Sequence, residues 1–307
     1  HWKKSFTDTS TNTARVALGR NQFLVDTSSG PYVNIKTNSL LFRNEFEKEL
    51  SPQINYTLGA SNEVTLYNIA ARVPPTGSNS GGIQTPGSTS TYTETTQTGA
   101  QDSGAVFSVF NFKSGIFTFS PSLRADGGTT GVEEVTIDPR LGARAALSDR
   151  DTIKTAVGSY HQRPSAQESA KYVGNPGLKT KYAIHYVLGY EREFATRLLP
   201  LFFDWQLFYR DIHRQILAVD SQYQNSGSGY AYGSEFYFKY GMPEIPNGWI
   251  SYTISQSMIR EKDGQPFRHF DNDQTHILTL IGNIPLGNHW ELGARFRYTS
   301  EIGRAHV

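Results

Sequence analysis

The feature that most constrains this chain is an alternation of apolar and polar side chains with a period of two. It is clearest in four segments, in which every second position is mostly apolar or aromatic. These apolar positions are Leu40, Phe42 and Phe46; Leu201, Phe203, Trp205, Leu207 and Tyr209; Tyr230, Tyr232, Phe236, Phe238 and Tyr240; and Trp290, Leu292, Ala294, Phe296 and Tyr298. Successive side chains of a β-strand point to opposite faces, so the pattern predicts strands with one apolar and one polar face.

The opposite faces of these segments carry several charges. They are Arg43, Glu45 and Glu47; Glu235 and Lys239; and Arg295 and Arg297. A soluble sheet with one wet face is the simpler explanation of such strands and stays open as an alternative. Aromatic residues stand at both ends of the apolar faces, however, as Tyr230 and Tyr240 do. Because Lys or Arg facing mid-bilayer lipid costs about 2–4 kcal/mol, we expect the charges to face a watery lumen and the aromatic ends to mark two membrane interfaces.

The alternation divides the chain into about thirteen strands. We expect them near 11–25, 36–50, 55–73, 102–112, 116–125, 135–147, 151–162, 181–194, 200–218, 228–240, 248–259, 273–284 and 289–300. Tight turns are predicted at Ser51–Ile54, Lys113–Gly115, Ser148–Arg150, Ala195–Leu199, Gly241–Asn247 and Pro285–Asn288. Mostly longer links lie between them. Short turns on one side and long loops on the other are typical of outer-membrane barrels, with periplasmic turns and extracellular loops.

Two Gly-rich segments fall between predicted strands. The longest link, Pro74–Gln101, is rich in Gly, Ser and Thr, and a linker between two domains would have that composition. Because strand patterns continue on both sides of it, we interpret it as an external loop of one barrel. The short segment Gly227–Gly229 precedes a strand rather than a helix, so it is predicted to be a turn and not a phosphate-binding loop.

Composition narrows the classes of function. No apolar run reaches the roughly 18 residues of a membrane-spanning helix. The net charge of +1 gives no sign of nucleic-acid binding. The absence of cysteine excludes disulfides, thiolate metal sites and cysteine nucleophiles. Aromatic residues make up 13% of a chain that is only 37% hydrophobic, a combination that suits a wall between lipid and water.

Both ends of the sequence suggest a fragment. The chain opens at His1-Trp2-Lys3-Lys4 without the apolar stretch of a signal peptide. Residues 301–307 are expected to be a non-native tail, which leaves 1–300 as one partial transmembrane β-barrel with extracellular loops. An odd number of up-and-down strands does not close into an antiparallel cylinder. We therefore expect further strands to be missing.

From Thr136 onward, the order and spacing of short motifs resemble those of TonB-dependent receptors. The matching segments are Thr136–Gly142, Lys154–Pro164, Gly174–Leu178, His185–Glu191, Phe208–Ile212, Gly229–Glu235, Trp249–Ser255, Phe270–His276 and Leu292–Ser300. Each segment is weak by itself, but their succession over about half the chain is specific. The earlier segments Arg43–Glu47 and Tyr56–Ala60 fit more loosely.

The resemblance implies an all-β fold, a transmembrane antiparallel barrel of which about 13–14 strands are present. Family barrels have about 22 strands around a plugged lumen. Neither the plug domain nor the segment that binds TonB is visible here. The implied function is uptake of a metal chelate, vitamin or carbohydrate in the outer membrane of a Gram-negative bacterium. The implied partners are outer-membrane lipid, a small molecule at the extracellular loops, and TonB through the plug, for a monomer without cofactor or enzymatic activity.

Other functions remain as alternatives, chiefly a passive porin, in which lumen charges set ion selectivity, and also an outer-membrane enzyme or adhesion scaffold. Metal binding would draw on His269–His276, where Asp271 and Asp273 share a strand face. Paired carboxylates for catalysis occur at Glu133–Glu134 and at Glu45 with Glu47, but lumen-facing charge explains them, and no Gly-x-Ser-x-Gly motif occurs. We assign no catalytic, metal or cofactor residue. Ligand contacts at the external loops would come from Arg163, Lys171, Tyr172 and Tyr223, each otherwise an ordinary surface residue.

Overall fold

The computed structural model describes residues 1–26, 32–73, 93–130, 132, 135–169, 174–194, 200–219, 222–242, 245–287 and 289–300. Within these residues the chain forms one antiparallel sheet of fifteen strands and one short helix. The elements are β1 (Trp2–Thr7), β2 (Ser10–Asp26), β3 (Tyr32–Ser51), β4 (Ile54–Val73), β5 (Thr93–Ser114), β6 (Phe117–Gly128), β7 (Thr136–Ala146), β8 (Asp151–Gln162), α1 (Ala166–Ser169), β9 (Lys181–Phe194), β10 (Leu201–Val219), β11 (Gln222–Tyr240), β12 (Asn247–Arg260), β13 (Arg268–His269), β14 (His276–Gly287) and β15 (Trp290–Thr299).

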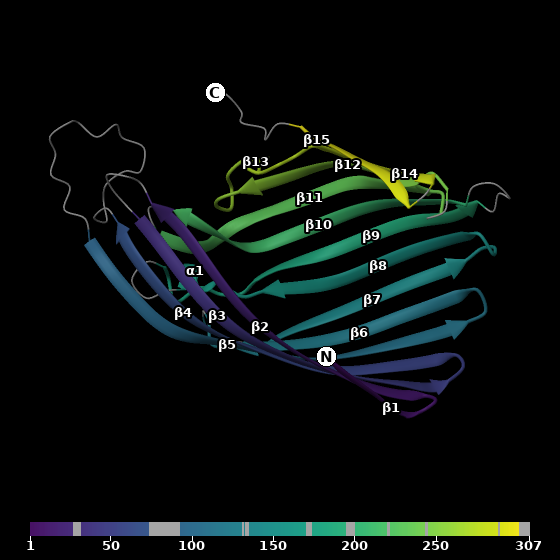
Figure 1. Ribbon diagram of the computed structural model, residues 1–307. Coiled ribbons are helices and arrows are strands. Elements are labelled where there is room, and N and C mark those ends of the chain that lie inside the picture. Colours follow the sequence, from purple (N-terminus) through teal and green to yellow (C-terminus); the bar gives the residue numbers. More distant parts are fainter. Residues whose placement is uncertain are drawn as a thin grey trace.

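Each strand pairs with the next one along the chain, except that β12 pairs with both β14 and the short β13. Figure 1 shows the resulting sheet curving from β1 and β2 round to β14 and β15. Among the described residues, β1 pairs only with β2 and β15 only with β14, so the sheet is open. The all-β, antiparallel fold predicted from the alternation is confirmed, and the soluble sandwich is not, because there is one sheet and not two.

All thirteen predicted strands are present, as β2 to β12, β14 and β15. The boundaries of β5 were wrong, since this strand begins at Thr93 and not near 102. Its partner β4 is long, and the ladder continues to Val73 opposite Thr93. Residues 93–101 are therefore strand, and the interdomain linker is excluded because β4 and β5 are neighbours in one sheet. The rest of that link, 74–92, lies outside the described residues.

The prediction of a turn at Gly227–Gly229 was also wrong, because these residues lie inside β11. The two glycines are needed for close packing and not for a turn. A Cβ atom on Gly227 would lie 2.6 Å from a methyl group of Leu217, and one on Gly229 would lie 2.4 Å from the Met258 carbonyl oxygen. The register of β10 against β11 shifts between Ile212 and Gln215, which matches the positive φ of Arg214.

The large apolar side chains gather on one face of the sheet, here called the apolar face, and most of them are exposed. Leu18, Leu40 and Val64 form one cross-strand row on this face, and Leu18 is 83% exposed. Leu188 and Leu207 form another such pair on β9 and β10. Contiguous exposed apolar surface of this extent marks contact with lipid or a partner. No described helix is long and apolar enough to cross a membrane.

The other face, here called the polar face, carries charged residues of the same strands, such as Arg43 on β3 and Lys154 on β8. The two ends of the strands also differ. At the short-turn end, β3 and β4 are joined by only Pro52 and Gln53, and the connection of β5 to β6 uses a positive φ at Gly115. At the long-loop end lie links such as 163–180 and 261–275. The connection of β10 to β11, residues 220–221, is an exception because it is short.

Candidate functional site on the polar face

The polar face of β3 to β6 carries a cluster that we call the first stack: Arg43, Glu45, Phe107, Arg124 and Asp126. The Phe107 ring lies across β4 above Gly59, where an added Cβ atom would come within 2.1 Å of it. The guanidinium groups of Arg43 and Arg124 lie 4.9 and 5.9 Å from the ring centroid. Glu45 pairs with Arg43 at 2.6 Å, and Asp126 pairs with Arg124 at 2.6 Å. Each arginine of the first stack therefore has a carboxylate at 2.6 Å, although Arg15 on β2 also pairs with Glu45, at 2.9 Å.

A second network lies nearer the short-turn end, on β7 to β10. The Lys154 ammonium group pairs with Glu191 at 2.9 Å and with Asp204 at 2.7 Å. Arg144 also donates to Glu191. Lys154 can cross β9 because Gly189 lies beneath it, where a Cβ atom would be 2.6 Å from the Lys154 Cε. Two cations and two carboxylates balance, which is the condition for charges that are largely removed from water.

A second stack lies on β7 to β10, closer to the long-loop end, and consists of Arg140, Tyr160, His185 and Arg210. Arg140 is opposite Gly158, Gly158 is opposite His185, and His185 is opposite Arg210. The Tyr160 ring centroid is 4.1 Å from the Arg140 guanidinium and 4.3 Å from the His185 ring. Gly158 makes room for this arrangement, because its Cβ would lie 2.7 Å from the Arg140 Cγ.

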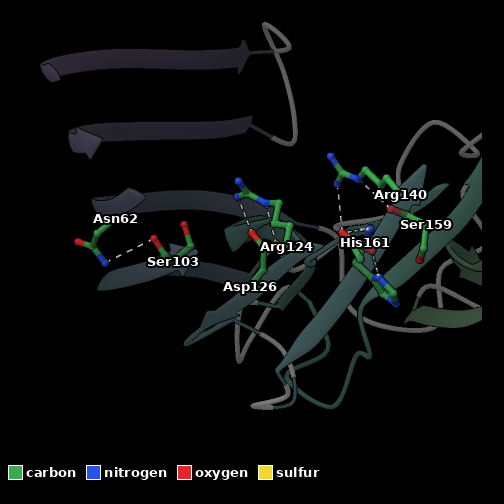
Figure 2. A network of polar contacts seen from close by, with 8 residues as sticks. Asn62, Ser103, Arg124, Asp126, Arg140, Ser159 and His161 are labelled. Carbon is green, nitrogen blue, oxygen red and sulfur yellow. Dashed lines mark hydrogen bonds and ion pairs between the residues drawn. The ribbon is translucent and has the colours of Figure 1, made fainter. Parts of the chain in front are cut away.

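The buried Asp138 closes a gap in the ladder between β7 and β8. Figure 2 shows Arg140, Ser159 and His161 around this gap. Paired residues of these strands end at Arg140 and Gly158. Beyond them the Asp138 carboxylate accepts the His161 backbone N–H at 3.2 Å and contacts the His161 Nδ1 at 2.6 Å. It also accepts from Arg140 at 3.4 Å. A side chain thus replaces a backbone rung.

Asp273 has the same role between β12 and β14. Its carboxylate accepts the Ser257 backbone N–H at 3.0 Å and contacts His269 Nδ1 at 3.2 Å. The side chain is 4% exposed, close to the 3% of Asp138. Both of these carboxylates lie toward the long-loop end, where the strand ladders stop being regular. We call Asp138 and Asp273 the carboxylate rungs.

The predicted metal candidate at His269–His276 is not assembled. Asp271 pairs with Arg268 at 2.7 Å, Asp273 is used as a rung, and His276 contacts the Tyr252 hydroxyl at 2.8 Å. No group of three metal-ligating side chains occurs among the described residues. Partial burial would lower the pKa of Arg268, but hydrogen bonds to Glu261 and Asp271 outweigh it and raise that pKa above its ordinary value.

The predicted ligand residues are used within the protein where they are described. Arg163 donates to the carbonyl oxygens of Gly128 and Thr130 at 3.4 and 3.3 Å, tying together two links at the long-loop end. The Tyr223 carbonyl oxygen accepts from Asn175 at 2.8 Å. Lys171 and Tyr172 lie outside the described residues, as do Glu133 and Glu134. The role of Arg163, Lys171, Tyr172 and Tyr223 in ligand contact stays a prediction.

Sequence reasoning missed Asn225, which anchors the link between β8 and β9. Its side chain accepts the Lys179 N–H at 2.7 Å and donates to the Lys179 carbonyl oxygen at 2.8 Å. It also donates to the Arg214 carbonyl oxygen at 3.0 Å. The start of α1 could have been found, because Ser165 and Glu168 have the spacing of a capping box. Each of these two side chains accepts the other's backbone N–H, at 3.2 and 2.7 Å.

The predicted lumen residues lie together on the polar face. Arg43 and Glu45 are paired there, and Glu235 follows on β11 opposite Gln206. Arg295 and Arg297 lie on β15, the last strand of the described sheet. Figure 2 shows Ser103, Arg124, Asp126 and Arg140 along this polar surface. Such a surface can hold a solvated or polar partner.

Comparison with known proteins identifies the fold. The family described as TonB dependent receptor-like, beta-barrel, matches residues 1–305. A comparison with curated proteins finds no significant match. Similar solved structures include FpvA of P. aeruginosa with pyoverdine (12% identity, TM-score 0.67), the ferric-catecholate import receptor Fiu of E. coli (14%, 0.68) and the ferric yersiniabactin uptake receptor FyuA of Yersinia pestis (15%, 0.69).

The chain is covered to 97%, 97% and 96% in these three comparisons, but it spans only 44%, 52% and 48% of the respective receptors. It thus corresponds to about half the length of each. Members of the matching family are non-enzymatic transporters of the Gram-negative outer membrane, which agrees with the exposed apolar face and the charged polar face. By its sheet, its two faces and the match over residues 1–305, the chain belongs to the TonB-dependent receptors, as part of their β-barrel.

Proposed function

We propose that this chain is part of the wall of a receptor that imports an iron chelate across the outer membrane with energy supplied through TonB. The match of residues 1–305 to the receptor barrel carries the proposal. FyuA is a ferric yersiniabactin uptake receptor, Fiu is a ferric-catecholate import receptor, and FpvA was solved with an iron-loaded pyoverdine. At 12–15% identity the likeness to these receptors concerns the fold and not the substrate. A vitamin or a carbohydrate is therefore the competing substrate class.

The long-loop end is proposed to face the cell exterior and the short-turn end the periplasm, as is usual for such barrels. A ligand arriving from outside would first meet links 163–180 and 261–275. Contacts of Arg163 and Asn225 hold the first link against its neighbours. That anchoring supports a binding surface of fixed shape at the long-loop end, because loops held by side-chain hydrogen bonds present the same surface to each ligand.

The polar face is proposed to line the lumen and to contact a plug domain supplied by another part of the protein. The first stack and the Lys154 network offer polar groups on β3 to β10 for that contact. Residues 1–300 would then be one partial barrel domain, with β1 and β15 each pairing with a further strand. An unpaired strand edge in lipid leaves backbone groups without partners, at several kcal/mol each. The non-native character of 301–307 remains a prediction outside the described residues.

Growth of a receptor-deficient Gram-negative strain on chelated iron tests the proposal. The complete gene should restore growth on at least one ferric chelate in a strain with TonB, and an otherwise identical strain without TonB should not grow. Empty vector is the control. Growth that does not depend on TonB, combined with a large and constantly open conductance of the purified protein, would instead identify a passive porin.

A further inference from the structure

The two stacks of the polar face are built alike but differ in how their arginines are paired with carboxylates. In the first stack, Arg43 and Arg124 each pair with a separate carboxylate at 2.6 Å. In the second stack, Arg140 has only Asp138, at 3.4 Å, and this carboxylate also contacts His161 at 2.6 Å. Among the described residues, no carboxylate pairs with Arg210. The second stack therefore has a cation without a matching anion.

Arg210 is exposed, and the nearest features of its surroundings are cationic or aromatic. Its guanidinium group lies 5.0 Å from the Phe208 ring centroid on the same strand. Across the ladder on one side is His185, with Arg140 two strands further on. Across the ladder on the other side is Ala231, which adds no charge. Asp211 follows in sequence, but it points to the opposite face and pairs with His213 at 3.0 Å.

Along the row of Arg210, the nearest acid is Asp273, which lies against Ser257 two strands away and contacts His269. The acids nearest to Arg210 on β10 and β11 lie on other rows of the sheet. Glu235 is opposite Gln206, four residues from Arg210 along β10. At about 3.3 Å per residue this separation is roughly 13 Å, beyond direct pairing. Asp204 is further away along the same strand and is used by Lys154 at 2.7 Å. An anion from outside the sheet is thus the partner that Arg210 lacks.

We propose that Arg210, with His185 beside it, forms a binding site for a small carboxylate anion on the lumen wall. A guanidinium group binds a carboxylate through two parallel N–H···O bonds. The row lies near the long-loop end, since His185 is four residues from the start of β9 at Lys181. The stack of Arg140, Tyr160 and His185 fixes one side of the site, because each group in it is packed against the next.

The site goes beyond the proposed function, because binding of an anion here requires neither iron nor TonB. It also differs from the predicted loop contacts, since none of Arg163, Lys171, Tyr172 and Tyr223 belongs to it. The expected ligand is a monovalent organic anion that is small enough for its carboxylate group to reach Arg210. An uncharged molecule of the same shape is not a ligand.

Fluorine NMR of the complete protein in detergent micelles tests the site. The probe is 4-fluorobenzoate, and 4-fluorobenzamide is its uncharged counterpart. The resonance of the benzoate should broaden with the unmodified protein, and that of the benzamide should not. Replacing Arg210→Gln should weaken benzoate binding by about tenfold or more, as expected for loss of a charge-assisted hydrogen-bond pair.

Arg43→Gln is the matched control, because it removes the same charge from the first stack, where the arginine already has a carboxylate at 2.6 Å. This variant should bind 4-fluorobenzoate within about twofold of the unmodified protein. Equal weakening by Arg43→Gln and Arg210→Gln would overturn the site in favour of a general charge effect. Failure of the unmodified protein to broaden the benzoate signal would overturn it as well. Neither result bears on TonB-dependent growth, so the proposed function is tested separately.

Discussion

The wall of the sheet and its long-loop end are held together by different means. In the wall, unbroken ladders such as β3 with β4, from Tyr32 to Glu49, place every side chain by the strand period alone. At the long-loop end, which we call the mouth, the ladders stop. There, single side chains such as Asp138, Asn225 and Asp273 accept hydrogen bonds from backbone N–H groups. The wall is therefore specified by a repeating pattern, whereas the mouth depends on individual residues.

This difference predicts that substitutions in the wall act on the whole barrel and that substitutions at the mouth act locally. The effect of a substitution in the wall on the free energy of unfolding should also depend on which face of the sheet the residue occupies. Four substitutions test these expectations, the first two in the wall and the last two at the mouth.

Lys154→Ala should have the largest effect on the free energy of unfolding, about 3–5 kcal/mol, because it leaves Glu191 and Asp204 without their shared cation. Denaturant-induced unfolding in lipid vesicles measures it. The double substitution Lys154→Ala with Asp204→Asn should recover part of the loss, since only one carboxylate then needs a partner, and Arg144 supplies it. If Lys154→Ala left the free energy of unfolding unchanged, the balanced network would be contradicted.

Leu207→Arg should destabilise the barrel by about 2–4 kcal/mol, because it places a charge on the face that contacts lipid. The adjacent Gln206 lies on the polar face, where it already donates to Asp204 at 3.1 Å. Gln206→Arg is therefore the matched control and should change stability by less than about 1 kcal/mol. The same unfolding measurement in vesicles compares the two variants. Equal costs would mean that the faces are assigned wrongly.

Asp138→Ala should cost about 1–3 kcal/mol, because the His161 backbone N–H loses its acceptor. The effect should be confined to the mouth. Hydrogen exchange should become faster at His161 and its neighbours and should stay unchanged in β3 and β4. Uniform acceleration along the strands would show that the rung supports the whole wall and not only its end.

Asn225→Ala should have the smallest effect, about 1 kcal/mol, because water can replace some of the hydrogen bonds lost at an exposed site. The link between β8 and β9 should nevertheless be cut more readily by proteases near Lys179, since both backbone bonds of that residue depend on Asn225. Asn21→Ala on β2, for which no side-chain hydrogen bond is described, serves as the control. Unchanged cleavage in Asn225→Ala would mean that other contacts position the link.

The wall could be predicted from the sequence because its signal repeats. Several residues indicate each face of a strand. The alternation from Leu201 to Tyr209 therefore predicted both that β10 exists and which of its faces is apolar. The mouth could not be predicted in this way. Asp138 and Asp273 were interpreted as a motif element and a metal candidate, because nothing in the order of residues says that a carboxylate will meet the backbone of a neighbouring strand. The early start of β5 escaped notice because its Thr-rich polar residues lack an apolar face.

Several long side chains of the polar face lie across a glycine of the neighbouring strand, with Phe107 over Gly59, Lys154 over Gly189 and Phe208 over Gly233. Side chains that lie flat reach less far toward the centre of the cylinder than upright ones. How far these three side chains stand above the sheet is consequently set by residues that have no side chain at all. Enlarging any of these glycines would lift a ring or an amine away from the sheet, although the lifted group itself stays unchanged.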